Sequence, residues 1–464
     1  MSASASPRTP ARSRVVRAGA AVTTARLASL SLAAVQVPLV ARLVPGDLFA
    51  TVPLTVQVAT LVGLVLADPA VLAFQRHPGD AGDRTAYRWA VQVVTAVLCS
   101  GCAALVVAGT LAGVTGLVVG AAGWALGLTA NRLSAVAWLA WGHEWRYTAS
   151  LVGSTALRTG VLLAALLAGV APWTALALAG AASALLAVAL APRTTPRRDG
   201  TLRPRLALGA GLAVGQLGLQ LLGSAPLVVA SALLGTTTTA TLGAATQVAL
   251  LLGTVLNLVT TVAYPRLRRR WDEGAEREVL VTLRLLVLAC ATGGAAALVL
   301  TGAGHGALPR LVLTAPLTDG ALVAALVTAS CASSIALVAS WAHQFRLLAG
   351  CLAGRSLATA STTVVLVAVG TTVDGVRGAA TGGLVGMLVH VGAMTAGSGV
   401  ADPASVCAAS TLAGVAAVGI VAPGTWAAVL AATGTALLCL ALLVRGVVVE
   451  RADRIDRASE RTSS

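Results

Sequence analysis

Long apolar runs alternate with short polar segments along the whole chain. A helix needs about 20 apolar residues to cross a bilayer, and runs of this length recur throughout the sequence. The pattern therefore predicts an all-α polytopic membrane protein with about fourteen transmembrane helices. The expected spans lie near residues 18–41, 49–73, 89–109, 113–139, 148–169, 173–191, 207–231, 239–263, 280–302, 319–341, 353–371, 377–396, 404–422 and 425–444.

Composition agrees with this class. Of the 464 residues, 57% are hydrophobic and 11% are charged, and the 49 glycines favour close packing of helices through small side chains. A net charge of +15 in a soluble protein would suggest a nucleic-acid partner. Here the arginines lie in short segments between apolar runs, which is the pattern of cytosolic membrane loops. We therefore expect membrane lipids and no nucleic acid among the partners.

The arginines also predict the topology. With the N-terminus in the cytosol, 25 of the 32 basic residues fall in cytosolic segments, and Arg42, Arg310 and Arg377 are the exceptions outside. Both termini are then cytosolic. The expected organisation is a tail (1–17), an N-lobe of helices 1–6 (18–191), a basic linker (192–206), a C-lobe of helices 7–12 (207–396), helices 13–14 (404–444) and a cytosolic tail (445–464).

An internal repeat relates the two lobes. Residues 57–76 and 247–266 match at nine of twenty positions without gaps, including Gln57 with Gln247 and Arg76 with Arg266. The polar matches carry more weight than the aliphatic ones in so apolar a chain. Two six-helix halves in the same orientation follow, a repeat type known in secondary transporters.

The turn after the first span carries a family resemblance. The segment Ala41-Arg42-Leu43-Val44-Pro45 to Phe49 resembles the Ala-Arg-x-Leu-Gly-Pro-x-x-Phe-Gly signature of polysaccharide and O-antigen flippases. These belong to the multidrug/oligosaccharidyl-lipid/polysaccharide exporter superfamily. Tyr264-Pro265-Arg266 and the twelve-helix core with two added helices are similar as well, although Val44 and Ala50 replace two signature glycines. The resemblance implies two lobes in a V around a central cavity that opens alternately to each side.

Three arginines lie deep within predicted spans and are candidate substrate ligands. Arg26, Arg132 and Arg158 each lie roughly eight to ten residues from the inner surface, which predicts a ring of positive charge open to the cytosol. Their forked guanidinium groups suit the oxygens of a diphosphate, and Asn131 adds a hydrogen-bond donor. The alternative is snorkelling or pairing with Asp68. Arg284 is close enough to the inner end to snorkel.

Other polar residues within the spans have less specific roles. Asp68 is either a salt-bridge partner or part of ion coupling, and Gln57 and Gln247 are candidate sugar contacts. Pro38 and Pro226 are candidate hinges, with simple packing kinks as the alternative. The histidines lack metal-ligand spacing, and no nucleophile with its base or pair of carboxylates is visible, so we assign no catalytic residue, metal or cofactor.

These observations favour a flippase of the bacterial plasma membrane. It would move an undecaprenyl-diphosphate-linked oligosaccharide from the inner to the outer leaflet by alternating access, and polysaccharide-assembly proteins are its expected partners. A multidrug extrusion antiporter is the nearest alternative, although its cationic substrates call for buried carboxylates. Two further alternatives remain. One is a membrane-embedded polysaccharide polymerase or ligase, which usually carries a large external catalytic loop, and the other is a scaffold for cell-wall assembly.

The topology is testable by labelling. In an otherwise cysteine-free protein, single cysteines in the 192–205 segment and in both tails should resist impermeant thiol reagents in intact cells and react after permeabilisation. Labelling of the 192–205 segment from outside would overturn the span assignment, and the repeat with it.

Overall fold

The structure is a computed structural model of the full chain. It describes residues 24–25, 27–29, 31–32, 35–76, 115–140, 143–191, 202–301, 319–346 and 348–400. Its regular elements in these ranges are all helical, and six of the described helices are long and apolar enough to cross a membrane. The all-α membrane fold predicted from the sequence is thus confirmed. The expected spans near 89–109, 404–422 and 425–444 lie outside the described residues.

The chain divides into two compact units. Unit 1 comprises Met1–Gln36 and Val58–Ala213, and unit 2 comprises Val37–Gln57 and Val214–Ser464. This division differs from the expected lobes in two respects. Val37–Gln57 groups with the C-terminal half, and unit 1 continues to Ala213, past the expected start of the C-lobe at residue 207. The end of the first helix, the turn after it and the start of the second helix therefore belong to unit 2.

Three helices of unit 1 pack together, and two of them, α4 and α6, approach closely through glycines. They are α4 (Thr115–Ala140), α5 (Glu144–Leu167) and α6 (Pro172–Ala189), and each packs against the other two. A Cβ added to Gly127 of α4 would lie 2.9 Å from the Cα of Gly180 on α6, so the two backbones are nearly in contact. At the end of α4, the Nε1 of Trp138 donates to the Leu190 carbonyl at 2.9 Å.

The signature turn is a buried element of unit 2. Residues 35–43 are helical, a short 3₁₀ turn η1 (Gly46–Leu48) follows, and α2 (Thr51–Arg76) begins three residues later. Phe49 is 1% exposed and Ala50 fully buried. Ala50 packs against Gly243 of α8 (Ala240–Asp272), where an added Cβ would lie 3.1 Å from the Ala50 Cα. Within unit 2, the turn thus packs directly against α8.

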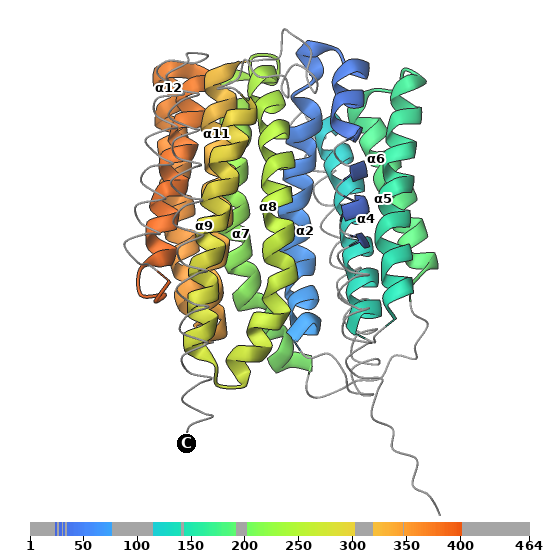
Figure 1. The fold of residues 1–464 in the computed structure, drawn as a ribbon. Helices are drawn as coiled ribbons and strands as arrows, with labels where there is room; N and C mark the ends of the chain where they lie inside the picture. Colours follow the sequence, from blue (N-terminus) through green and yellow to red (C-terminus); the bar gives the residue numbers. More distant parts are fainter. Residues whose placement is uncertain are drawn as a thin grey trace, which may run out of the picture. The chain divides into compact units, whose positions relative to one another are not determined.

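Helix α11 (Gly320–Phe345) is the centre of unit 2. It lies beside α8, α9 (Glu276–Thr301) and α12 (Ala349–Thr395) and packs against all three (Figure 1). Most of its residues are buried. Helix α7 (Leu202–Leu234) contacts α12, since a Cβ on Gly215 would lie 3.2 Å from the Leu352 Cγ.

Helix α12 is an antiparallel hairpin. Its helical dihedrals break at Asp374 and at Gly375, whose φ of +55° favours glycine. Beyond the break the chain returns along itself, because Gly378 contacts Gly370 and Thr359 is hydrogen-bonded to His390. The two spans expected at 353–371 and 377–396 are therefore confirmed as separate legs of one hairpin.

Element lengths recur between the two halves. Helices α4 and α11 both contain 26 residues, and three residues separate each from the helix that follows. Helices α2 and α8 begin 189 residues apart, close to the 190-residue offset of the sequence repeat. These lengths agree with a repeat, and superposition of the two halves stays a prediction.

Arg377, which the sequence-based topology placed outside, has a structural partner. Its NH2 lies 3.2 Å from the Oδ2 of Asp319, whose other carboxylate oxygen accepts hydrogen bonds from the Ala321 and Leu322 amides. Asp319 therefore caps the start of α11 and ties it to the second leg of α12.

The hairpin contact predicts a position that tolerates no side chain. A Cβ at Gly382 would lie 2.8 Å from the carbonyl carbon of Leu366, so Gly382→Ala should lower the free energy of unfolding by roughly 1–3 kcal/mol through overpacking. Gly392→Ala is the matched control on the same leg, because nothing lies within 4 Å of its added Cβ. Melting temperatures in detergent should fall for the first variant alone, and equal melting of both would contradict the close approach.

Candidate functional site

Arg158 is the most unusual polar residue of unit 1. It lies near the middle of α5, and its Cζ is 4.7 Å from the ring centroid of Trp124 on α4. Its Nε and NH1 atoms are buried and have no hydrogen-bond partner among the described residues. The indole Nε1 of Trp124 is likewise buried and unpaired there. Among the described residues, two side chains on neighbouring helices thus leave three N–H-bearing atoms without a hydrogen-bond partner.

The surrounding face of α5 is polar. Ser154 lies one turn before Arg158, is fully buried, and has no partner for its Oγ among the described residues. One residue after Arg158, Thr159 donates from Oγ1 to the Oε1 of Gln36 at 3.1 Å. This bond joins α5 to the first helix within unit 1. Arg158 therefore lies one helical turn from a buried hydroxyl, and its neighbour Thr159 ties α5 to the first helix.

The energetics of Arg158 are unfavourable without a further partner. A cation over an indole ring contributes about 0.5–2 kcal/mol. Removing a guanidinium from water costs several kcal/mol when no anion or full set of acceptors replaces the water. The desolvation cost exceeds the gain from stacking, so the observed contacts do not explain why an arginine stands here. An anionic ligand would supply the missing acceptors and the missing charge.

The structure does not place the predicted arginines at one depth. Arg132 lies eight residues after Trp124 on α4, so about 12 Å of helix axis separates it from the residue on which Arg158 stacks. Arg132 is exposed, whereas the Nε and NH1 of Arg158 are enclosed. The expectation of three arginines at similar depth is therefore wrong for this pair. Arg26 lies outside the described residues.

The other predicted ligands are distributed over both units. Asn131 is 4% exposed, and its Oδ1 has no partner among the described residues. Gln57 is 3% exposed, and its Oε1 is buried and likewise has no partner among the described residues. Gln247 is half-buried. Asp68 lies in α2, and its side chain is outside the described part. Of the predicted amide ligands, Asn131 and Gln57 are thus the two with a buried, unpaired oxygen in the part of the chain that the structure describes.

The two candidate hinge prolines differ in their surroundings. The change from unit 1 to unit 2 falls between Gln36 and Val37, immediately before Pro38. Pro226 lies inside unit 2, where it packs directly against Gly383 of the α12 hairpin. This contact favours a packing role for Pro226, and a hinge at Pro38 stays a prediction.

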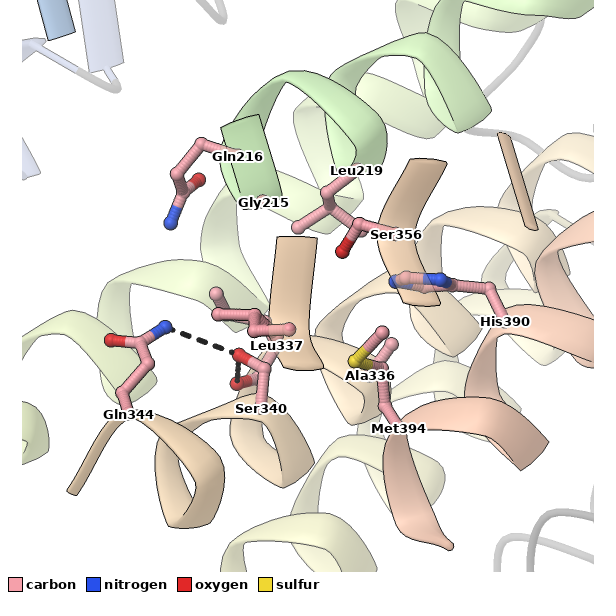
Figure 2. A pocket seen from close by; sticks show the side chains of 11 residues that line it. Gly215, Gln216, Leu219, Ala336, Leu337, Ser340, Gln344, Ser356, His390 and Met394 are labelled. Carbon is pink, nitrogen blue, oxygen red and sulfur yellow. Dashed lines mark hydrogen bonds between the residues drawn. The ribbon is translucent and has the colours of Figure 1, made fainter. Parts of the chain in front are cut away.

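A second polar site lies within unit 2, between α7, α11 and α12. Figure 2 shows a small hollow with Gln216 on one side and polar side chains from the other helices facing it. The hollow has room for about one water molecule. Its polar lining consists of Gln216, Ser340, Gln344, Ser356 and His390.

Hydrogen bonds connect the hollow to the helices around it. Gln344 donates from Nε2 to Ser340 at 3.4 Å and accepts from the Tyr264 hydroxyl at 3.1 Å. His390 is bound through Nδ1 to Thr359 at 2.7 Å. The sequence analysis assigned no role to the histidines, His390 among them, and did not single out Ser340, Gln344 or Ser356. One feature of the sequence could have indicated this polar cluster. Ser340 and Gln344 are four residues apart, which places both on one face of an apolar helix.

Comparison with known proteins identifies the fold. No protein-family model and no curated protein sequence matches the chain. Among solved structures, it is similar to the lipid II flippase MurJ in an inward closed conformation, with a TM-score of 0.56 and 12% identity over 93% of this chain and 100% of that one. An inward-facing multidrug resistance MATE family transporter of the MOP superfamily matches with a TM-score of 0.53 and 13% identity, over 84% and 99% of the two chains.

A third structure extends the comparison to a bound complex. The MATE multidrug transporter DinF-BH, solved with a ligand, matches with a TM-score of 0.55 and 10% identity, over 85% of this chain and 97% of that one. The resemblance seen in the sequence is therefore confirmed for the fold of the superfamily. At these identities the fold is shared by a flippase and by multidrug transporters alike, so it does not distinguish the substrate.

The unpaired state of Arg158 predicts a gain in stability on its removal. Arg158→Met replaces the cation with an apolar side chain of comparable length, and we expect it to stabilise the ligand-free protein by about 1–4 kcal/mol. The adjacent Leu157→Met is the control, because Leu157 is 38% exposed and should tolerate the change. Melting temperatures in detergent without added ligand measure the effect. A strong loss of stability in Arg158→Met would show that the arginine has partners that satisfy it.

Proposed function

We propose that the chain is a flippase that moves an undecaprenyl-diphosphate-linked oligosaccharide from the inner to the outer leaflet by alternating access. The observation that carries the proposal is the enclosed guanidinium of Arg158, with two nitrogens unpaired among the described residues. A site of this kind favours an anion over a cation. The shared fold with a lipid II flippase agrees with it.

A diphosphate fits the chemistry of the candidate ligands. Guanidinium groups bind phosphate oxygens through two parallel hydrogen bonds, and these charge-assisted bonds are about twice as strong as neutral ones. Arg158 and the Trp124 indole offer donors on adjacent helices, and the amide of Asn131 adds a further group. Arg132 lies further along α4, where a second phosphate or an entering headgroup would first meet the unit. We assign these residues to substrate binding, together with Arg26, and Gln57 and Gln247 to sugar contact.

The transport step needs no bond to form or break. The lipid tail would stay in the bilayer while the charged headgroup and sugars cross within the protein. Release requires the interactions with Arg158 to weaken as the protein changes from one conformation to the other. A ligand that binds both conformations equally well does not shift the equilibrium between them. The change between units beside Pro38 is where we place the flexing point.

Multidrug extrusion is the second candidate, and the likeness to MATE structures favours it. A cationic substrate calls for a carboxylate within the membrane. In the described ranges, Asp68 of α2 is the acidic residue that lies within a span, and the other acidic residues lie at helix ends, turns or loops. The balance of charge therefore favours an anionic substrate.

Transport by the purified protein tests the proposal. Proteoliposomes would carry a fluorescent undecaprenyl-diphosphate oligosaccharide, and a membrane-impermeant enzyme that modifies the sugar would report its arrival in the opposite leaflet. Arg158→Gln and Arg132→Gln should each reduce the rate at least tenfold, the loss expected for one strong charge-assisted contact. Arg158→Lys should recover part of it, because the charge remains and the fork is lost. Arg277→Gln, on an exposed helix start, should transport normally.

Three outcomes would reject the proposal. Normal rates in both Arg158→Gln and Arg132→Gln would move the anion site elsewhere. Efflux of a cationic dye that requires Asp68, without any flipping of the lipid, would establish the extruder instead. Absence of both activities in protein that is folded and inserted would favour the scaffold.

A further inference from the structure

Three arginines converge on the short segment that ends α12. Arg355 donates from NH1 to the carbonyls of Ala393 (3.0 Å) and Ala396 (2.6 Å). Arg346 donates to the Gly397 carbonyl at 3.0 Å, and Arg284 donates to the Gly399 carbonyl at 3.0 Å. We call Arg284, Arg346 and Arg355 the arginine clamp. They come from α9, the end of α11 and the start of α12.

The backbone of the segment is shaped to receive them. Gly397 and Gly399 have φ values of +68° and +74°, which L-residues with a side chain rarely adopt. The last carbonyls of a helix lack intrahelical partners and carry partial negative charge. The clamp supplies donors to these carbonyls, so part of its role is to cap α12.

Capping does not use all of the clamp. Each guanidinium has five N–H donors, yet the bonds to the segment come from one nitrogen of each arginine. The Nε of Arg284 is buried without a partner among the described residues. Donors therefore remain available in a place where water is partly excluded.

The clamp is also a concentration of positive charge. An added Cβ on Gly399 would lie 3.4 Å from the NH2 of Arg346, and Arg284 binds the carbonyl of the same residue. Nearby carboxylates pair with other arginines: Asp272 with Arg268, Glu273 with Arg269 and Glu278 with Arg270. No ion pair to a carboxylate neutralises the clamp within the described residues. Helix carbonyls offset only part of three full charges.

We infer that the arginine clamp binds the phosphate group of an anionic membrane lipid. The clamp lies at the ends of apolar helices that are long enough to cross the bilayer, which is the level of the lipid headgroups. Arg346 also lies beside the buried ring of Trp271, whose centroid is 5.8 Å from the Arg346 Cζ. A phosphate there would use the spare guanidinium donors and compensate the charge. The inference is independent of the proposed flippase activity.

Lipid-dependent stability of the full chain tests it. Melting temperatures would be measured in micelles alone, with added phosphatidylglycerol, with added phosphatidylcholine, and with inorganic phosphate. Each protein is compared with its own lipid-free value, so a lost cap does not count as a lost lipid effect. The variants are Arg284→Gln, Arg346→Gln and Arg346→Lys. Arg277→Gln is the matched control, since Arg277 is exposed at the same end of the unit and makes the same change in charge.

Phosphatidylglycerol should raise the melting temperature of the unaltered protein and of Arg277→Gln well above the effect of phosphatidylcholine. In Arg284→Gln and Arg346→Gln that extra rise should at least halve, with Arg346→Lys in between because it keeps the charge and loses the fork. An equal extra rise in all the variants would reduce the clamp to a helix cap. An effect of inorganic phosphate without any effect of the lipid would make it a small-anion site and overturn the lipid assignment.

Discussion

Hydrocarbon offers no hydrogen bonds, and this constraint decides both the shape of the chain and the places where its polar groups lie. Inside a bilayer each backbone amide must find its partner within the protein, which restricts the described spans to helices. Helix ends remain the weak points because their last carbonyls have no partner. Arg268 meets this need at the end of α11, where its NH1 donates to the Phe345 carbonyl at 3.1 Å. An arginine at a helix end can thus satisfy the carbonyls that the helix itself leaves unpaired.

Close packing follows from the same constraint, because apolar surface gains little by leaving lipid. Helices then associate through contact area and through hydrogen bonds between them, both of which improve as backbones approach. Glycine permits the approach between Gly127 and Gly180 in unit 1 and between the legs of α12 in unit 2. Within the α12 hairpin, the close approach of the two legs brings Thr359 within hydrogen-bond distance of His390. Small residues thus permit the buried polar contact between the legs.

The value of an arginine in this protein depends on its position. Arg377 pairs with Asp319 at a helix start and stabilises the join between α11 and α12. Arg284, expected to snorkel, reaches a backbone carbonyl at the helix ends, where spare donors can meet lipid. Arg158 stacks on Trp124 and keeps two nitrogens unpaired within the described part of the chain. A protein loses stability at such a residue, and binding of an anion is the function that would offset the loss.

By itself, the sequence determined the helical membrane class, most span boundaries and the signature turn, since run length and turn residues are local properties that hydrocarbon enforces directly. It also indicated the two legs of α12 and a repeat with which the helix lengths agree. Only the tertiary structure decided that Val37–Gln57 packs with the second half, and that Arg158 meets Trp124 at a different depth from Arg132. It also decided that polar residues of three helices share one hollow. Distance along a helix gives the depth of a side chain, whereas its partner depends on which helix face lies opposite, and that is settled by packing between segments far apart in sequence.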